Sequence, residues 1–467
     1  MDKLLDTVSL LNRNLSDYIL TFLLCGTGIY FTIRTRFVQV RCFAEGWKRV
    51  FGNFSLHGKN SRSGLSSFQA LSTAIAAQVG TGNIVGASGA ILTGGPGAIF
   101  WMWVIAFFGM ATSYAEAVLA QKTRITDESG NLHGGPCYYI KHAFPNLFGK
   151  ILAVWFAVAT IISLGLMGCM VQANSIGETC QNAFGIPAPV IGILIVIAAG
   201  AIFLGGISRI ARVTEKLVPG MALLYLAGGL VILICRYECL PETFGLIFKF
   251  AFTPEALIGG SFGAALKTAV SQGVKRGLFS NEAGMGSTPH AHALANVKSP
   301  HEQGTVAMIG VFIDTAIILT MTALIVISTI YTGNGPLAHA TGETYAGIIA
   351  NAGLTKTNLV QIAVASVSTT TIGNIFVAIC LLFFAFSTII GWNFFGKINC
   401  HYLFGKKSIL FYSIAALVFI YLGTLVKNDL VWELQDLFNQ LMVLPNVIAL
   451  AALSGMVAAS AKNNNML

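Results

Sequence analysis

The residues best suited to chemistry form a short polar run, QVGTGN at residues 78–83, inside an apolar segment. Two glycines around a threonine, followed by an asparagine, are poor helix formers. Non-helical backbone at the middle of a membrane persists only where it lines a polar cavity or a binding site. Its free carbonyls can ligate a hard cation, and its free N–H groups can hold a carboxylate. The alternative is a glycine-lined crossing that lets two helices approach closely.

A second interruption, at Gly260, Ser261, Phe262 and Gly263, lies five predicted helices further along the chain. Two interrupted segments at matching positions of two five-helix halves predict an inverted repeat with a binding site near the membrane midplane. Residues 271–273, Ser-Gln-Gly, are a competing location for this break. We prefer the earlier one because residues 275 and 276, Lys and Arg, then emerge at the inner face of the membrane.

Adjacent hydroxyls at Ser387 and Thr388 lie within another apolar segment. Hard oxygen ligands of this kind suit Na⁺. The alternative is that both hydroxyls donate to carbonyls of their own helix, which is common for serine and threonine in helices.

Charged residues within the apolar segments are few, and each is a candidate functional group. Asp314 could couple a cation to transport, or it could form a structural ion pair with Lys267. Glu116, near the inner end of its segment, is expected to pair with Arg276 or Lys122.

No enzyme motif is present in the sequence. His290 and His292 point in different directions on a helix, and no further metal ligands accompany them. Walker and GxSxG motifs are lacking, as is a repeated pore loop. We therefore expect no catalytic activity, no organic cofactor and no obligatory protein partner.

The elements that must position these residues are membrane-spanning helices. Of the 467 residues, 55% are hydrophobic and only 10% are charged. A spanning helix needs roughly 20 apolar residues. We predict an all-α polytopic membrane protein with about eleven spans, embedded in a lipid bilayer, from apolar segments at 15–32, 66–93, 97–120, 148–176, 187–206, 215–235, 243–274, 304–331, 359–396, 408–426 and 434–459.

The distribution of basic residues predicts the orientation. Most of the 28 Lys and Arg residues fall on one side if the N-terminus lies outside and the C-terminus lies in the cytoplasm. This asymmetry also explains the net charge of +9 without a nucleic-acid partner. Residues 1–63 are expected to hold an N-terminal helix and a basic, partly interfacial amphipathic segment. Residues 64–462 form one transport domain, with repeats at about 64–236 and 243–460.

Several segments resemble the alanine or glycine:cation symporter family. The tryptophan-rich GGPGAIFWMW at 94–103 is the most specific, and AAQVGTGNIVGA (76–87), GGPCYYI (134–140), KRGLFSNEAGMGS (275–287) and FAFSTIIGW (384–392) also match. The resemblance implies a symporter of alanine or glycine that is driven by Na⁺, or sometimes by H⁺, in a bacterial-type cytoplasmic membrane. It implies the five-plus-five fold of the bacterial leucine transporter, with one extra N-terminal helix and two broken helices.

The resemblance also implies roles for individual residues. Sodium would be bound by carbonyls of Ala76 and Val79 with the hydroxyls of Ser387 and Thr388. The FSNEAG motif is interpreted as a loop or gate at the inner face. The substrate would contact both breaks, and its side chain would meet a glutamine and a tryptophan; the full set is Gln78, Gly80, Thr81, Gly82, Asn83, Gln172, Gly260, Ser261, Phe262, Gly263 and Trp392.

Two other hypotheses stay open. A transporter of the same fold could carry another small amphipathic substrate with H⁺ through Asp314. A passive channel or structural membrane protein would use its glycines only for close packing.

Overall fold

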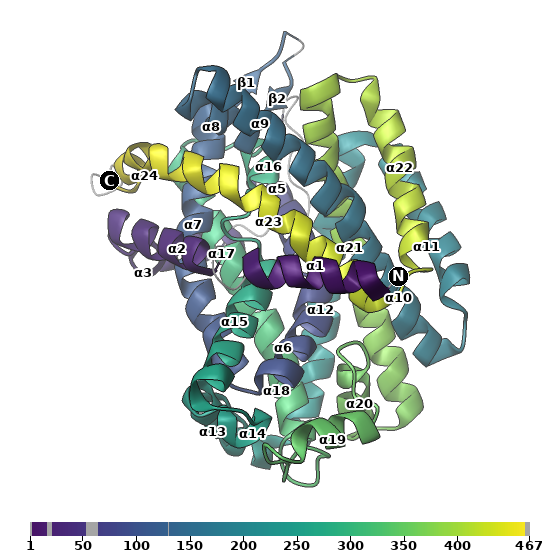
Figure 1. Ribbon diagram of the computed structural model, residues 1–467. Coiled ribbons are helices and arrows are strands. Elements are labelled where there is room, and N and C mark those ends of the chain that lie inside the picture. The colour runs from purple at the N-terminus through teal and green to yellow at the C-terminus, as the bar shows by residue number, and fades with distance from the viewer. Residues whose placement is uncertain (1, 16–20, 53–63, 129, 463–467) are drawn as a thin grey trace.

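A computed structural model describes residues 2–15, 21–52, 64–128 and 130–462. Within these ranges the chain is almost entirely helical, with one two-stranded antiparallel hairpin, β1 (Ile125–Thr126) and β2 (Leu132–His133) (Figure 1). The hairpin and α8 (Pro136–Ala143) lie at one end of the helical bundle. Helices α13 (Leu240–Phe252) and α14 (Glu255–Ile258) lie at the opposite end, near α19 (Tyr345–Asn351).

Among the described residues, five helical stretches are long and apolar enough to cross a membrane. Two further pairs of helices are candidate spans if each bent pair is counted as one span. Two more apolar helices are shorter than 18 residues. The long stretches are α7 (Ala98–Thr123), α9–η3–α10 (Leu147–Thr160, Ile161–Gly168, Cys169–Phe184), α12 (Gly206–Cys235), α17–η5–α18 (Pro300–Phe312, Ile313–Leu319, Thr320–Ile330) and α21 (Thr370–Phe404). The remaining members are α5 (Ser67–Gln78), η2 (Gly82–Gly86), α6 (Ala87–Gly94), α11 (Ala188–Phe203), α22 (Ser408–Gly423), α23 (Asn428–Ala452) and α24 (Ser454–Lys462). The structure thus has the helical, multi-pass character that the composition predicts.

The predicted break in the first long apolar segment is confirmed. Helix α5 starts with a capping box, in which Ser66 and Gln69 satisfy each other's backbone N–H groups, and it ends at Gln78. The chain resumes as the π-helical turn η2 and then α6, bent by 46° from α5.

The second break lies elsewhere than predicted. Residues 260–263 are exposed at the start of α15 (Phe262–Asn281), beside α14, and not inside the bundle. Helix α15 continues through 271–273 and ends at Asn281, and α16 (Pro289–Ala293) follows a non-helical stretch at 282–288. All residues of that stretch are buried. The glycines at 259 and 260 therefore mark a turn at the bundle end.

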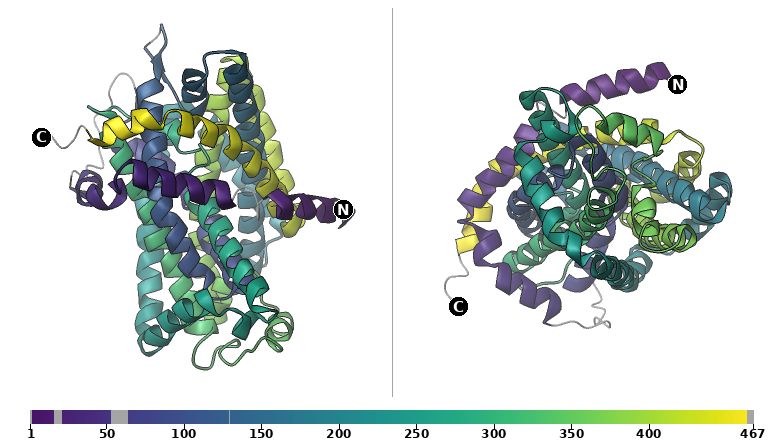
Figure 2. Two further views of the ribbon diagram at one scale, coloured as in Figure 1. Left: turned by 60° about the vertical axis from the view of Figure 1, so that its left-hand side comes forward. Right: turned by 90° about the horizontal axis from the view of Figure 1, so that it is seen from below.

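The N-terminal helices α1 (Asp2–Leu15) and α2 (Thr21–Arg34) run across the long helices instead of alongside them, as both side views show (Figures 1 and 2). The amphipathic segment predicted within residues 1–63 is present as α3 (Val38–Arg41) and α4 (Phe43–Phe51), while residues 53–63 lie outside the described part. After α12 the chain continues through the short turn η4 (Tyr237–Cys239) into α13. Helix α20 (Leu359–Ala365) precedes α21.

Candidate functional site

The first break is held open by side chains and not by helical hydrogen bonds. The Gly80 N–H donates to Oδ1 of Asn83 at 3.0 Å, and the Thr81 N–H donates to Oε1 of Gln172 at 3.1 Å. Gln172 comes from α10, so a second helix supports the break. The hydroxyl of Thr81 is fully buried and has no hydrogen-bond partner among the described residues. A buried unpartnered hydroxyl at a break is a ready contact for a polar ligand.

The second break is organised around a buried carboxylate. Glu116 on α7 accepts from the N–H groups of Gly284 and Gly286 at 3.2 and 2.9 Å, and from the side chain of Asn446 at 2.7 Å. Both glycines have positive φ, at 85° and 80°, which other residues adopt only with strain. The expected pairing of Glu116 with Arg276 or Lys122 is therefore wrong. The backbone amides freed by the break satisfy this anion instead.

The two breaks face each other. The side chain of Gln78, at the end of α5, donates to the carbonyl of Asn281, at the end of α15, at 2.7 Å. Its Oε1 atom is buried without a partner among the described residues. Glu282, the first residue beyond α15, is fully buried and accepts from the indole N–H of Trp392 and from the hydroxyl of Ser287.

Asp314, on η5, lies beside both breaks. Its carboxylate accepts from Asn83 at 2.6 Å, from Ser280 at 2.9 and 3.1 Å, and from Thr315 at 2.9 Å. Asp314 is fully buried, whereas Lys267 is exposed on α15. The predicted structural pair of these two residues is therefore not formed, and neutral donors surround the carboxylate instead.

The four residues predicted to form a sodium site come together between α5 and α21. The Thr388 hydroxyl lies 2.9 Å from the Ala76 carbonyl and 3.3 Å from the Val79 carbonyl. The Ser387 hydroxyl lies 3.3 Å from the Ala76 carbonyl. Both hydroxyls also lie within hydrogen-bond distance of the Phe384 carbonyl in their own helix. Ser387 is closer to the carbonyl of its own helix, at 2.8 Å against 3.3 Å, and Thr388 is closer to the carbonyl of α5, at 2.9 Å against 3.1 Å. The geometry therefore allows both interpretations drawn from the sequence.

Aromatic rings and an ion pair cover the breaks on the side of α15. Phe279 lies edge-on to Trp392, with ring centroids 6.1 Å apart, and 5.2 Å from Trp432 on α23. Arg276 lies over the Trp432 ring and pairs with Asp436 at 3.0 Å, as does Lys275. The expected position of these two cations at the inner face is wrong, because a buried carboxylate on α23 retains them inside the bundle.

On the opposite side, Arg124 and Gln121 from α7 donate to carbonyls just beyond α16. Arg124 reaches the carbonyl of Ala295 at 2.6 Å, and Gln121 reaches the same atom at 3.0 Å. Residue Leu65 pairs its backbone with Leu294 and Asn296 at 2.8 Å each. These contacts fix the segment that follows α16 against α7 and the start of α5.

Sequence reasoning missed the second-break residues Ser280, Asn281 and Glu282. The signal was present, because SNEAGMGS combines polar residues with two closely spaced glycines, as GTGN does in the first break. Basic residues just before it favoured a loop at the membrane surface. Their partner, Asp436, is remote in sequence and could not be assigned without the fold.

Two discontinuous helices that face each other within a membrane bundle, with buried carboxylates and unpartnered polar atoms between them, define a secondary transporter. A model of the sodium:alanine symporter family matches residues 1–465. The chain belongs to the sodium:alanine symporter family, as the sequence motifs indicated.

Two relatives are similar to this chain over nearly its whole length. The sodium/alanine symporter AgcS of Methanococcus maripaludis is 41% identical over 99% of this chain and 98% of its own length. A probable sodium/glutamine symporter of Bacillus subtilis, GlnT, is 38% identical over 98% of this chain and 90% of its own. Among solved structures, MhsT in complex with L-phenylalanine has a TM-score of 0.60 at 15% identity and covers 84% of this chain and 90% of its own. That likeness shows a shared fold.

Proposed function

We propose that the protein imports alanine or glycine together with Na⁺ by alternating access, using the space between the two helix breaks. The observation that carries this proposal is the juxtaposition of the breaks through Gln78 and Asn281, beside the oxygen cluster of Ser387 and Thr388. The sodium/alanine relative at 41% identity supports the choice of ion and substrate.

The substrate would lie against Thr81 and Gln78, whose buried oxygens lack partners among the described residues. A methyl group at Gly80 would lie 2.3 Å from the Thr388 hydroxyl and 3.1 Å from Gln172, so the backbone approaches these side chains as closely as glycine permits. Phe279 and Trp392 close the same space. Tight surroundings of this kind favour a small side chain, since extra methylenes would clash.

One Na⁺ would be bound by the carbonyls of Ala76 and Val79 with the hydroxyls of Ser387 and Thr388, to which the Phe384 carbonyl can be added. Neutral oxygen ligands in this number suit a hard monovalent cation. No organic cofactor is required by this mechanism.

Asp314 provides a second position for coupling. Its carboxylate is buried among the neutral donors Asn83, Ser280 and Thr315. A buried anion of this kind is stabilised by a second cation or by protonation. Protonation of Asp314 supports the alternative of H⁺ coupling. Coupling of this kind could also drive transport of another small amphipathic substrate.

We further propose a five-plus-five repeat preceded by the N-terminal segment 1–63, with eleven spans in all. Support comes from the order of elements. In the first half the broken helix α5–α6 is followed by four longer apolar segments, α7, α9–η3–α10, α11 and α12, and in the second half α15–α16 is followed by α17–η5–α18, α21, α22 and α23. The two halves correspond to about 64–236 and 243–460. The basic-residue asymmetry favours a cell membrane location with the N-terminus outside and the C-terminus in the cytoplasm.

The test is uptake of labelled L-alanine, D-alanine and glycine into proteoliposomes, with Na⁺ replaced by choline or Li⁺. We expect uptake only with an inward Na⁺ gradient, and its loss in Gly80→Ala. Gly263→Ala is the matched control, because an added methyl at that exposed glycine meets nothing within 4 Å. Uptake that follows a pH gradient without Na⁺ would favour H⁺ coupling through Asp314. Uptake without any gradient dependence would favour a passive channel.

A further inference from the structure

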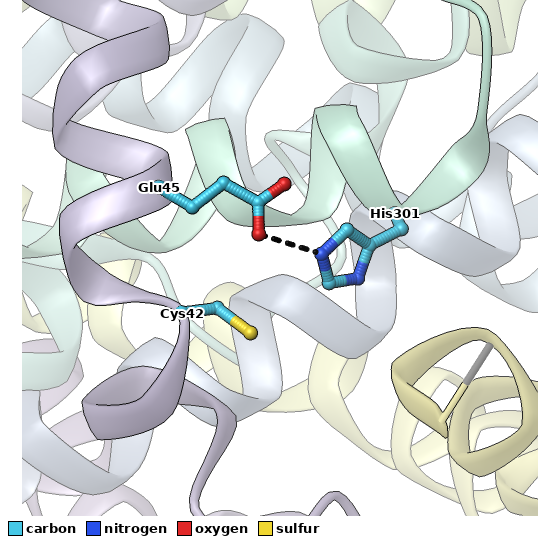
Figure 3. A group of neighbouring side chains, drawn as sticks. All are labelled: Cys42, Glu45 and His301. Carbon is cyan, nitrogen blue, oxygen red and sulfur yellow. Dashed lines mark hydrogen bonds and ion pairs between the residues drawn. The ribbon is translucent and has the colours of Figure 1, made fainter. Parts of the chain in front are cut away.

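Three side chains with different ligand chemistry converge where α4 meets α17, outside the transport site (Figure 3). Cys42 is the residue that immediately precedes α4, and Glu45 lies in the first turn of that helix. His301, near the start of α17, points toward them. The thiol sulfur, a carboxylate oxygen and a ring nitrogen all lie within 4.8 Å of one another.

Helices α4 and α17 pack closely at the point where these three side chains converge. Gly46 on α4 faces α17, and a methyl group there would lie 2.7 Å from the Thr305 carbonyl and 2.9 Å from Ile309. The ring of Phe43 packs edge-on against Phe312, with centroids 4.9 Å apart. The position of α4 on α17 is thus set by contacts that do not involve the three polar side chains. Cys42 and His301 are buried at this contact, and Glu45 is half-buried.

A second layer orients the histidine. The hydroxyl of Tyr114, fully buried on α7, lies 2.7 Å from Nδ1 of His301. Gly304 leaves room for the Tyr114 ring, since a methyl group there would lie 2.7 Å from it. A hydrogen bond at Nδ1 fixes the ring so that Nε2 faces Glu45, 3.4 Å away. Metal-binding histidines usually have their second nitrogen held in this way.

The charges around the cluster leave one carboxylate oxygen available. Arg49 donates to Oε1 of Glu45 at 2.8 Å, and its guanidinium also pairs with Glu302 at 3.3 Å. Oε2 of Glu45 faces the histidine. Arg49 is therefore shared between two carboxylates. Arg41, next to Cys42, places a second positive charge near the cluster, and its guanidinium donates to the carbonyls of Thr35 and Ala461.

We propose that Cys42, Glu45 and His301 form a binding site for a divalent cation of the zinc class. A thiolate, an imidazole and a carboxylate are the ligands that Zn²⁺ takes in proteins, and three protein ligands with water in the fourth position are a common arrangement. Alkali and alkaline-earth ions prefer all-oxygen sites. The thiol therefore distinguishes the ligand set of this site from that of the sodium site. The bound ion links α4 to α17, the helical stretch that continues into η5 and Asp314.

Metal binding by the purified full chain tests the proposal. After treatment with a chelator, titration with Zn²⁺ in competition with a chromophoric chelator is expected to show one ion per chain. Cys42→Ser and His301→Gln should each weaken the affinity at least tenfold. The matched controls are Cys235→Ser and His142→Gln, which alter exposed residues of the same types outside the cluster. With Co²⁺ as the probe, a thiolate-to-metal absorption band should appear in the wild-type and control chains and be lost in Cys42→Ser.

Tyr114→Phe keeps the packing of α7 and removes only the hydrogen bond to His301, so it addresses the case in which a ligand variant does not fold. We expect it to weaken Zn²⁺ binding by about 10-fold to 100-fold, as loss of an outer hydrogen bond does at other sites. The proposal is overturned if the wild-type chain binds no Zn²⁺ more tightly than the folded Cys42→Ser or His301→Gln chains. It is also overturned if the cobalt band persists without Cys42. These readouts do not depend on transport.

Discussion

Thr388 offers the sharpest test of the sodium site. Its hydroxyl oxygen lies 2.9 Å from the Ala76 carbonyl and 3.3 Å from the Val79 carbonyl, and the side chain is fully buried. Thr388→Val replaces the hydroxyl with a methyl group of similar size, which offers no lone pair. Thr388→Ser restores the hydroxyl and removes only the methyl group, so it is the matched control.

The magnitude follows from the loss of one neutral ligand among several. Interactions of a neutral dipole with a charged group contribute about 1.5–3 kcal/mol. Since about 1.4 kcal/mol corresponds to a tenfold change in affinity, the Na⁺ concentration for half-maximal uptake should rise by about 10-fold to 100-fold in Thr388→Val. Apparent alanine affinity should fall at limiting Na⁺ and recover at saturating Na⁺, because linkage between two ligands is reciprocal.

The assay is alanine uptake into proteoliposomes across a series of Na⁺ concentrations, together with Na⁺-dependent binding of alanine to the purified protein. If Thr388 only donates to the Phe384 carbonyl of its own helix, Thr388→Val will lower stability and leave the Na⁺ dependence unchanged. Unchanged Na⁺ dependence in Thr388→Val, in Ser387→Ala and in the double variant would refute the site. The coupling role would then pass to Asp314.

Other expectations can be checked with the same preparations. Asn83→Ala removes the acceptor of the Gly80 N–H and a donor to Asp314, so alanine uptake should be lost while the protein stays folded by size-exclusion chromatography. Glu116→Gln weakens the acceptor of two break amides and should reduce the free energy of unfolding by about 1–3 kcal/mol, measured by denaturation in detergent. Trp392→Phe removes the donor to Glu282 and should reduce the affinity for alanine more than the affinity for Na⁺. Isothermal titration calorimetry with each ligand would measure the two affinities separately. A reporter fused after Lys462 should be active only on the cytoplasmic side, and activity outside would contradict the proposed topology.

The local features of the sequence predicted the first break and its partners well. Glycine and asparagine at 80–83 cannot continue a regular helix, and the structure bends there by 46°. The grouping of Ala76, Val79, Ser387 and Thr388 was implied by family resemblance, and the structure brings all four together. Their affinity for Na⁺ remains a prediction.

The second break is predicted at the wrong residues because its position is chosen so that charged side chains stay out of the bilayer. Lys275 and Arg276 were assigned to the membrane surface, since an unpaired cation in the bilayer is costly. Asp436 removes that cost, but it lies about 160 residues away in sequence, as the Arg276–Asp436 hydrogen bond records. Long-range pairing of this kind leaves no local pattern. The same holds for Glu116, whose partners, the amides of Gly284 and Gly286 and the side chain of Asn446, are all remote in sequence.

The hydrogen bonds of Glu116 make the two breaks mechanically unequal. Its carboxylate joins α7 to the second break and, through Asn446, to α23, where Tyr139 of α8 donates to the same amide. Separating these elements would leave an anion without partners among apolar side chains, which is costly. The backbone N–H groups of the first break are instead held by the neutral side chains of Asn83 and Gln172. We therefore expect the second break to move as part of a rigid body during transport, and the first break to change its local conformation.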